Sequence, residues 1–311
     1  MELLEFILKM KNINYHSKMY KKEVIIIGKN SFISQKLVNK LGRKEKIHII
    51  EKRENYYSKP VWLNLIKKNT TIVFLAFDSS LISQKNNFFS FNKKIFNFFD
   101  LLEKHIKKNK IFPNIVFLST VTVYGNTKLN LVNENFKLNP QTEYDISKIF
   151  FEKLVLKLSV SCNLKSTILR LSNVLGFSEI SKQKDRGILN KIIKKIKINE
   201  VIQIYGSGKY LRDYIDIDDL VNGIIKSIRI CKPGIYNLCS GKSYSLIYIL
   251  KKIEKMMSVK IIKKFVKFPK NFSNIEKRDF KGSNKYFSKN FNWKTNFSLE
   301  KSLKKIYKEI I

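Results

Sequence analysis

The sequence predicts an α/β fold in which a doubly wound parallel sheet is joined to a smaller C-terminal lobe. Short apolar runs alternate with amphipathic stretches of helical period through the first half of the chain. Clusters of Gly, Pro and Asn become more frequent in the second half. With 311 residues and 44% hydrophobic content, the chain can bury a large core as one α/β unit or two closely joined lobes.

The elements follow each other in an order typical of parallel strands with crossover helices. Each expected strand is a short run rich in Val, Ile, Leu, Phe and Thr, and each expected helix has an apolar stripe. Strands are expected at 23–27, 46–50, 71–76, 114–119 and 166–171, and helices at 32–41, 88–108, 144–160, 187–198, 217–230 and 244–256. The βαβ order of the first half favours the doubly wound sheet.

The domain division follows from this order of elements. Residues 22–172 are expected to form the sheet domain, to which 201–240 return in part. Residues 173–200 and 241–311 are expected to form the smaller lobe. Residues 1–21 are an N-terminal extension that contains Met10 and Met19, and no function is assigned to them.

The formal net charge of +36 raises the alternative of a polyanion-binding protein. Only seven of the 61 basic residues are Arg, whereas Lys, Ile, Asn and Phe abound throughout the chain. A codon bias spreads Lys over every solvated face, but a nucleic-acid site concentrates basic residues on one face. We therefore expect no specific nucleic-acid partner, with a selected polyanion site as the charge-led alternative.

Cysteine and histidine residues favour neither a disulfide framework nor a metal site. Cys162, Cys231 and Cys239 form no CxxC pair, and the three His residues are scattered along the chain. The apolar runs are too short for a membrane span, and the N-terminus has no signal-peptide pattern. A cytoplasmic protein without membrane contact is the expectation.

The expected helix 88–108 carries Phe and Leu residues on more than one face. One face can pack on the sheet, and the other needs a second cover. That cover is either a neighbouring helix of the same chain or a partner subunit. In the second case, helices 88–108 and 144–160 would form a homodimer interface.

The first strand leads into the stretch VIIIGKNSFIS, residues 24–34, which has the outline of a dinucleotide-binding turn. The turn lies at the carboxyl end of a strand and opens a helix, where a helix N-terminus can hold a pyrophosphate. In a G-x-x-G-x-x-G spacing, Gly28, Ser31 and Ser34 occupy the three glycine positions. Because only one glycine is present, a purely structural turn remains the alternative.

The second apolar run ends at Glu51, 23 residues after Gly28. An acid at this distance binds the adenosine ribose hydroxyls of NAD. Lys52 and Arg53 follow directly, and these cations could instead receive the 2′-phosphate of NADP. All three residues are also consistent with a charged loop.

Several later stretches carry a more specific signal. FLSTVTVYG at 117–125 resembles S-[ST]-x-x-V-Y-G, and YDISK at 144–148 matches Y-x-x-x-K. Other stretches are also similar to motifs of one family: LRLSNVLG at 169–176, YGSGKYLRDYIDIDD at 205–219 and YNLCSG at 236–241. FNW at 291–293 resembles a further motif more loosely. In their order these stretches resemble the NAD-dependent epimerase/dehydratase family, the extended short-chain dehydrogenases. The resemblance runs from about residue 22 to the C-terminus and implies a Rossmann sheet and a substrate-binding lobe.

The resemblance implies a catalytic triad of Thr120, Tyr144 and Lys148. Tyr144 and Lys148 are four residues apart on an expected helix, so an ammonium can sit beside a phenol and lower its pKa. Thr120 would donate a hydrogen bond to the substrate oxygen. A bare Y-x-x-x-K on a helix is usually an amphipathic surface, but the preceding Thr120 motif reverses that interpretation.

The resemblance also assigns binding residues. Asn173, Arg212 and Arg278 would contact the nucleotide diphosphate of the substrate, because guanidinium groups suit phosphate oxygens. An ion pair of Arg212 with Asp213 or Asp216 is the alternative for that side chain, and a purely structural role is the alternative for Arg278. The expected cofactor is NAD, with NADP possible, bound by Gly28, Ser31, Phe32, Ile33, Glu51, Leu75, Ala76, Tyr144 and Lys148.

Departures from the family pattern narrow the expected activity. Val121 and Thr122 stand where sugar-nucleotide dehydratases carry an Asp-Glu pair, which disfavours a dehydratase. Phe77 replaces a small residue near the cofactor. The resemblance therefore implies a sugar-nucleotide 4-epimerase that works through a transient 4-keto sugar. The alternatives are a 4-keto-sugar reductase or dehydrogenase and a non-catalytic nucleotide- or RNA-binding member.

Overall fold

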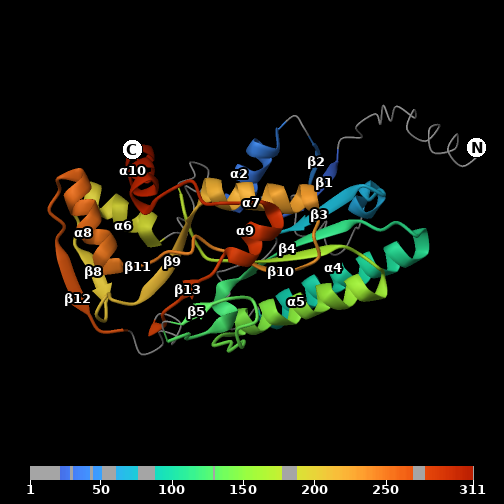
Figure 1. The fold of residues 1–311 in the computed structure, drawn as a ribbon, viewed down its shortest axis with the longest axis horizontal. Coiled ribbons are helices and arrows are strands. Elements are labelled where there is room, and N and C mark those ends of the chain that lie inside the picture. The colour runs from blue at the N-terminus through green and yellow to red at the C-terminus, as the bar shows by residue number, and fades with distance from the viewer. Residues whose placement is uncertain are drawn as a thin grey trace, which may run out of the picture.

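The computed structural model describes residues 22–28, 31–42, 45–50, 61–75, 88–128, 130–176, 188–268 and 277–310. The N-terminal extension, Glu51 with Lys52 and Arg53, and Ala76 with Phe77 lie outside these ranges. The described elements form a central sheet with helices on both faces and a smaller group of helices and strands at one end (Figure 1).

The central sheet has six parallel strands in the order β10-β6-β4-β3-β1-β2. From β1 the chain first forms β2 on one side and then crosses to β3 on the other, so the strand order reverses between β1 and β3. The carboxyl ends of all six strands lie at the same edge. The strands are β1 (Glu23–Ile27), β2 (Lys46–Ile50), β3 (Thr70–Phe74), β4 (Asn114–Thr120), β6 (Ser166–Leu171) and β10 (Gly234–Leu238).

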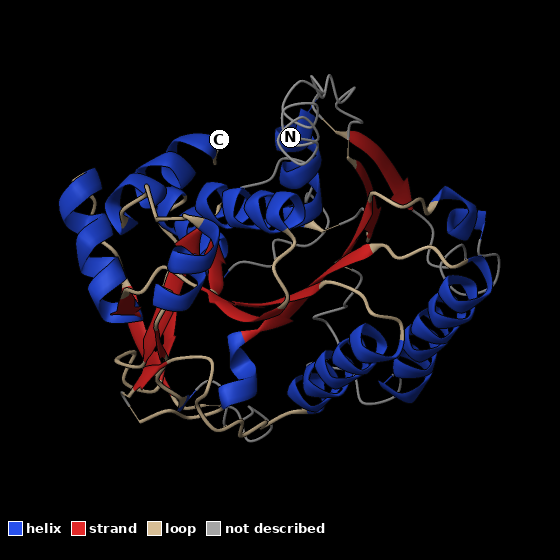
Figure 2. Cartoon of the chain, turned by 45° about the vertical axis from the view of Figure 1, so that its right-hand side comes forward, coloured by secondary structure: helices blue, strands red, loops and turns tan. Residues whose placement is uncertain are grey.

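Helices cover both faces of this sheet (Figure 2). On one face, α2 (Phe32–Leu41), α7 (Ile217–Ile230) and α9 (Lys285–Phe291) pack over Val24, Ile26 and other buried residues of the strands. On the other, α4 (Phe88–Asn109) and α5 (Glu143–Ser161) pack side by side. Successive strand residues point to opposite faces, so a run such as Val24–Ile27 supplies both cores.

The core under α4 and α5 is rich in aromatic side chains. The Phe74 ring lies 5.0 Å from Phe98 and 6.0 Å from Phe117, and Phe98 stacks on Trp62 at 4.7 Å between centroids. Trp62 belongs to the short helix η2 (Val61–Leu65). One face of α4 is therefore held on the sheet by ring packing.

The smaller lobe has its own core. Buried Ile and Leu residues of α6 (Ile188–Lys197), α8 (Leu246–Met257) and α10 (Leu299–Glu309) pack against β8 (Ile202–Tyr205). β8 pairs in parallel with β12 (Lys263–Val266). The chain forms two further small sheets. One consists of β7 (Asn173–Leu175), β9 (Leu211–Asp216) and β11 (Ser243–Ser245), and the other of β5 (Leu131–Val132) and β13 (Lys281–Gly282).

The division into domains stays a prediction, and the packing adds two details. β8, which belongs to the segment expected to return to the sheet domain, shares the lobe core. α9, which follows residue 240, packs instead on α7 and β10 of the sheet.

The expected elements agree closely with the structure. The strand expected at 71–76 corresponds to β3, which spans Thr70–Phe74 and so begins and ends earlier. Helix 244–256 begins at Leu246, because Ser243–Ser245 pair with β9 and Ser245 Oγ accepts a hydrogen bond from Tyr248 N at 3.2 Å. Several elements were not expected: β10, although its Tyr236 and Asn237 were noted as part of a motif, the strands of the small sheets and of the lobe, and the helices α9 and α10.

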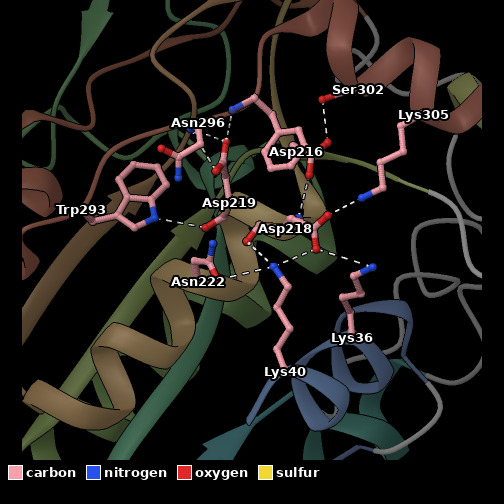
Figure 3. Close-up of polar contacts among 11 residues, drawn as sticks. Lys36, Lys40, Asp216, Asp218, Asp219, Asn222, Trp293, Asn296, Ser302 and Lys305 are labelled. Carbon is pink, nitrogen blue, oxygen red and sulfur yellow. Dashed lines mark hydrogen bonds and ion pairs between the residues drawn. The ribbon is translucent and has the colours of Figure 1, made fainter. Parts of the chain in front are cut away.

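Three acidic side chains at the start of α7 connect separate parts of the chain (Figure 3). We call these residues, Asp216, Asp218 and Asp219, the α7 hub. Asp218 forms ion pairs with Lys40 at 2.8 Å, Lys36 at 3.5 Å and Lys305. Asp216 caps the helix through Asp218 N and accepts a hydrogen bond from Ser302, and Asp219 accepts those of Asn296 N and Phe297 N. The hub thereby joins α2 of the sheet domain to α10 of the lobe.

Candidate active site

The candidate site lies at the carboxyl edge of the central sheet. Gly28 follows β1, Leu75 follows β3, and Thr120 is the last residue of β4. These three strands are neighbours in the sheet. In open parallel sheets, ligands bind at this edge where the strand order reverses, which here is between β1 and β3.

The turn after β1 has the geometry of a helix-capping turn. Gly28 has φ 108°, a conformation that side chains disfavour, so glycine is required there. Ser31 has φ −90° and ψ 145°, and its Oγ accepts a hydrogen bond from Ser34 N at 3.0 Å. Ser31 is thus the N-cap of α2. Its backbone conformation needs no glycine.

The remaining cofactor candidates divide into described and undescribed positions. Leu75 N donates to Ile27 O at 2.9 Å, so Leu75 borders the turn after β1. Phe32 and Ile33 are half-buried and pack on the core beneath α2 and α7. Any contact of theirs with a ligand in the turn would come from the backbone. Glu51 and Ala76 lie outside the described residues.

A chain of hydrogen bonds connects Thr120 to the start of α5. Thr120 is nearly buried, and its Oγ1 donates to Thr122 Oγ1 at 3.1 Å and accepts from Thr122 N at 3.2 Å. Thr122 Oγ1 in turn donates to Asp145. Since Asp145 follows Tyr144 directly, this chain ties the end of β4 to the first turn of the helix that carries the tyrosine.

Tyr144 and Lys148 lie one turn apart on α5, as their spacing predicts. Thr142 caps the helix by accepting from Asp145 N at 3.2 Å. Lys148 Nζ donates to Leu118 O of β4 at 2.6 Å and lies 5.6 Å from the centre of the Tyr144 ring. The ammonium is therefore held between the end of β4 and the tyrosine ring.

Burial governs the ionisation of this pair. It lowers the pKa of Lys148 to about 7, and the negative charge of Glu152 opposes that shift. Burial also raises the pKa of Tyr144 well above its usual value, and the charge of Asp145 adds to this effect. The phenolate is thus disfavoured in the unliganded protein. A positive charge beside the ring must lower the pKa of Tyr144 for it to act as a base.

Arg278 and Arg212 reach the same region from the C-terminal half of the chain. Arg278 is buried, and its Nη1 donates to Thr122 O at 3.2 Å. Arg212 Nη1 donates to Leu211 O at 3.1 Å and to Arg278 O. The structure thus brings both arginines next to the segment that follows Thr120.

Asn173 lies on the neighbouring strand β7. Its Nδ2 donates to Asp213 O at 3.2 Å, and its side chain is largely exposed. Asp213 is buried and accepts hydrogen bonds from Ser240 N and Gly241 N, both at 2.8 Å. Burial raises the pKa of Asp213 to about 6 despite these hydrogen bonds. Asp213 therefore fixes the loop after β10 beside the strand that carries Arg212.

A buried polar network behind Lys148 was not expected from the sequence; we call it the α5 network and define it as Ser119, Tyr124, Glu152, Arg170 and Asn237. Arg170 of β6 donates to both carboxylate oxygens of Glu152, at 3.1 and 2.7 Å. Ser119 also donates to Glu152. Tyr124 accepts from Arg170 and donates to Asn237, both at 2.8 Å.

Most of this network belongs to the motifs that carry the family resemblance. Ser119 and Tyr124 lie in the motif at 117–125, Arg170 in that at 169–176 and Asn237 in that at 236–241. Gly125 ends the first of them with φ 66°, and a Cβ there would lie 2.1 Å from Asn139 O. A signal for Glu152 was its spacing of four residues after Lys148, which places both on one face of α5.

The comparison with protein families agrees with this arrangement. The family model described as the NAD dependent epimerase/dehydratase family matches residues 24–239. The chain belongs to this family. The match begins at β1 and ends just after β10, so it covers the whole central sheet together with the Thr120, Tyr144 and Lys148 positions.

Curated relatives show several activities. The UDP-glucose 4-epimerase of Pasteurella multocida is 30% identical over 185 residues, which are 53% of this chain and 54% of that protein. The dTDP-4-dehydro-6-deoxyglucose reductase of Escherichia coli is 32% identical over 150 residues, 48% of this chain and 47% of that protein. The chain thus spans about half the length of the curated relatives it matches.

Solved structures share the fold along nearly the whole chain. The UDP-glucose 4-epimerase of Thermotoga maritima with UDP-glucose has a TM-score of 0.80 and 18% identity, covering 92% of this chain and 97% of that one. The UDP-glucuronic acid 4-epimerase of Bacillus cereus with UDP-glucuronic acid and NAD has a TM-score of 0.75 and 19% identity, covering 93% and 98%. In the described part of the chain, no helix has the length and apolar composition of a membrane span.

Proposed function

We propose that the protein is an NAD-dependent sugar-nucleotide 4-epimerase. The observation that carries this proposal is the placement of Thr120, Tyr144 and Lys148 around the carboxyl end of β4, beside the glycine turn after β1. The 4-epimerases among the relatives and the structural neighbours support it. Thr122 stands where a dehydratase would need an acid, and it is engaged with Asp145.

The residues around the β1 turn fit a dinucleotide. Gly28 adds no side chain at the end of β1, and Ser31 caps a ten-residue helix whose N-terminus is a favoured place for a pyrophosphate. Leu75 would border the same turn, and Glu51 would bind the ribose if NAD is used. Bound there, the dinucleotide would supply a reversible hydride acceptor for carbon C4 of the sugar.

Tyr144 would move the proton in this reaction. Its phenolate would take the proton of the C4 hydroxyl as the 4-keto sugar forms, and the phenol would return it after the sugar has turned over. Thr120 Oγ1 would donate a hydrogen bond to the same oxygen in place of the one that it gives to Thr122 Oγ1. Lys148, held by Leu118 O, would supply the positive charge that lowers the pKa of Tyr144.

The nucleotide diphosphate would lie across the segment from Thr122 to β9. Arg278 and Arg212 would direct guanidinium N–H groups to its oxygens, and Asn173 would donate from the exposed end of β7. The buried diphosphate contacts would hold the sugar at Tyr144 while the ring turns over.

A 4-keto-sugar reductase is the second candidate. The 32% identical reductase of Escherichia coli favours it, and the same triad would serve both reactions. A reductase consumes one reduced nicotinamide for each product, whereas an epimerase consumes none. The three described cysteines are free and buried, so either enzyme would suit a reducing compartment such as the cytoplasm.

Nicotinamide balance tests the proposal. The purified protein is incubated with NAD and with UDP-glucose or dTDP-glucose, and the sugars are analysed for inversion at C4 while nicotinamide absorbance is followed. Inversion without net change of absorbance is expected, with Tyr144→Phe as the inactive control. In a parallel incubation with NADPH and a 4-keto sugar nucleotide, stoichiometric consumption of the reduced nicotinamide, together with no inversion of either glucose substrate, would replace the epimerase by the reductase.

We also propose that a second copy of the chain covers α4 and α5. Phe96 of α4 and Phe150 of α5 are 45% and 48% exposed, and their rings lie 6.5 Å apart. Ile146 and Val160 extend this apolar surface along α5. Two such helices from each subunit can pack around a two-fold axis.

The oligomeric state in solution, measured by sedimentation, tests this second proposal. A dimer is expected for the wild type and a monomer for Phe150→Glu, because a charge would be buried in the interface. Leu131→Glu is the matched control, since Leu131 is similarly exposed but lies on β5. A monomeric wild type at micromolar concentration would contradict the proposed interface.

A further inference from the structure

Glu152 lies behind Tyr144 and Lys148 on α5 and has no part in the proton transfer proposed for that pair. Tyr144, Lys148 and Glu152 follow each other at intervals of four residues on α5, so they line one face of the helix. Glu152 is 2% exposed and Lys148 is 3% exposed. A buried carboxylate is stable only when other groups compensate its charge.

Two different partners hold the Glu152 carboxylate in place. Arg170 contacts it through Nε and Nη2, at 3.1 and 2.7 Å, in the bidentate geometry that a guanidinium allows. Ser119, the residue before Thr120, adds a third hydrogen bond from β4. The carboxylate is thereby fixed to both strands on which α5 packs, β4 and β6.

We propose that Glu152 is a positioning residue for the catalytic pair: its carboxylate, clamped by Arg170 and Ser119, keeps Lys148 in the ammonium form that faces Tyr144. This inference rests on the proposed roles of Tyr144 and Lys148. It assigns to the Glu152–Arg170 pair a function beyond the joining of α5 to the sheet.

The charges around Lys148 show why a counter-ion matters there. Burial opposes the ammonium, and Glu152 is the anion whose charge favours it. Arg170 offsets part of that charge, because the two side chains share one salt bridge. The ionisable groups near Lys148 are Tyr144, Asp145 and Glu152 on α5, Arg170 on β6 and Tyr124 on the short helix η5 (Val121–Tyr124).

Loss of the carboxylate has a predictable direction. Without the Glu152 charge, the pKa of Lys148 falls further below its usual value, so less ammonium is present at neutral pH. Tyr144 then loses the cation that favours its phenolate. A shift on the order of one pH unit is expected for a charge one helical turn away, at an effective dielectric constant of about 20.

The direct experiment is a titration of the cofactor-free protein with ¹³C-labelled lysine. Lys148 is expected to titrate below the ordinary lysines because burial lowers its pKa to about 7, and Lys148→Arg identifies its resonance. Glu152→Gln should move the midpoint of this resonance to lower pH. Ser119→Ala removes one hydrogen bond to the same carboxylate but keeps its charge and the Arg170 clamp, so this matched control should shift the midpoint much less than Glu152→Gln.

Folding and activity are separated by a second variant and a second readout. Glu152→Gln strands Arg170, so Glu152→Gln/Arg170→Met removes both charges and should give a smaller shift in a better folded protein. In turnover, the alkaline limb of the pH profile of Glu152→Gln should move to lower pH, because Lys148 then loses its proton at lower pH, whereas a purely structural defect lowers only the height of the profile. An unshifted Lys148 midpoint in both variants would overturn the role of Glu152. Because the titration needs no turnover, its result stands even if the epimerase activity is not found.

Discussion

The α5 network and the α7 hub both centre on a buried or nearly buried carboxylate, but they bind it with different cations. Glu152 is held by one arginine, and both side chains are 3% exposed. Asp218 is held by three lysines whose side chains are 27–34% exposed, while its own side chain is 11% exposed. A chain with seven Arg residues thus places one of them on Glu152, one helical turn from Lys148, and uses lysines where α2, α7 and α10 meet.

This difference follows from the chemistry of the two cations. The planar guanidinium fixes the direction of a carboxylate through two hydrogen bonds, whereas an ammonium on a flexible stem acts as a point charge. The α5 network can therefore define a geometry, which proton transfer requires. The α7 hub provides attraction between α2, α7 and α10 that is open to solvent and to screening ions.

The largest effect is expected at the residue that the α5 network supports. Tyr144→Phe removes only the proton-transferring oxygen, so turnover should fall by about 10²- to 10⁴-fold while the protein remains folded. Dinucleotide binding, measured by calorimetry, should persist. Turnover at the wild-type rate would show that another group moves the proton.

Removing one partner of the central carboxylate should affect the free energy of unfolding differently in the two networks. Arg170→Met leaves the Glu152 carboxylate buried and unpaired, so the free energy of unfolding in urea should fall by about 3–5 kcal/mol. Arg170→Met/Glu152→Leu should recover much of this loss. If the double variant is less stable than the single one, the loss is due to packing and not to the stranded charge.

The corresponding change in the α7 hub should cost less and depend on salt. Asp218→Asn is expected to lower the free energy of unfolding by on the order of 1 kcal/mol, and the loss should shrink at about 1 M salt. The control is Asp100→Asn, which breaks the exposed pair of Asp100 with Lys104. If the loss of unfolding free energy on Asp218→Asn does not depend on salt, the α7 hub is not screened by solvent ions, and the difference drawn between the two networks is wrong.

The pH dependence of the hub has a defined sign. Burial opposes ionisation of Asp218, but the hydrogen bonds from Lys305 and Lys40 prevail and lower its pKa to about 2. The folded state therefore binds the proton more weakly than the unfolded state. The difference in stability between wild type and Asp218→Asn should be constant above about pH 5 and disappear as the pH falls through the folded-state pKa.

The smallest effect is expected at the cofactor turn. Ser31→Gly removes the cap of α2 and should cost only a few tenths of a kcal/mol in stability, because glycine is itself tolerated at this position. Since Ser31 has an ordinary backbone conformation, affinity for NAD should be unchanged or slightly tighter. A marked loss of affinity would show that the Ser31 side chain itself binds the dinucleotide.

The sequence was informative where local patterns determine the outcome. The run Val24–Ile27 defines a strand through its own residues, and the Tyr144–Lys148 spacing fixes a shared helix face. The Glu152–Arg170 pair depends on β6 lying beside β4, and Asp218 meets Lys305 across 87 positions of the chain. Such contacts follow from tertiary packing, so neither network could be read from local spacing.

The hydrogen at C4 of the sugar provides the most direct test of the proposed epimerase. UDP-glucose that carries deuterium at C4 is incubated with the wild-type protein and NAD, and the inverted sugar is analysed by mass spectrometry. If oxidation and reduction occur in one site, the deuterium should return to C4 of the same sugar, with none in the free nicotinamide pool. Loss of deuterium to free nicotinamide, or absence of the inverted sugar for every nucleotide sugar tried, would contradict the account.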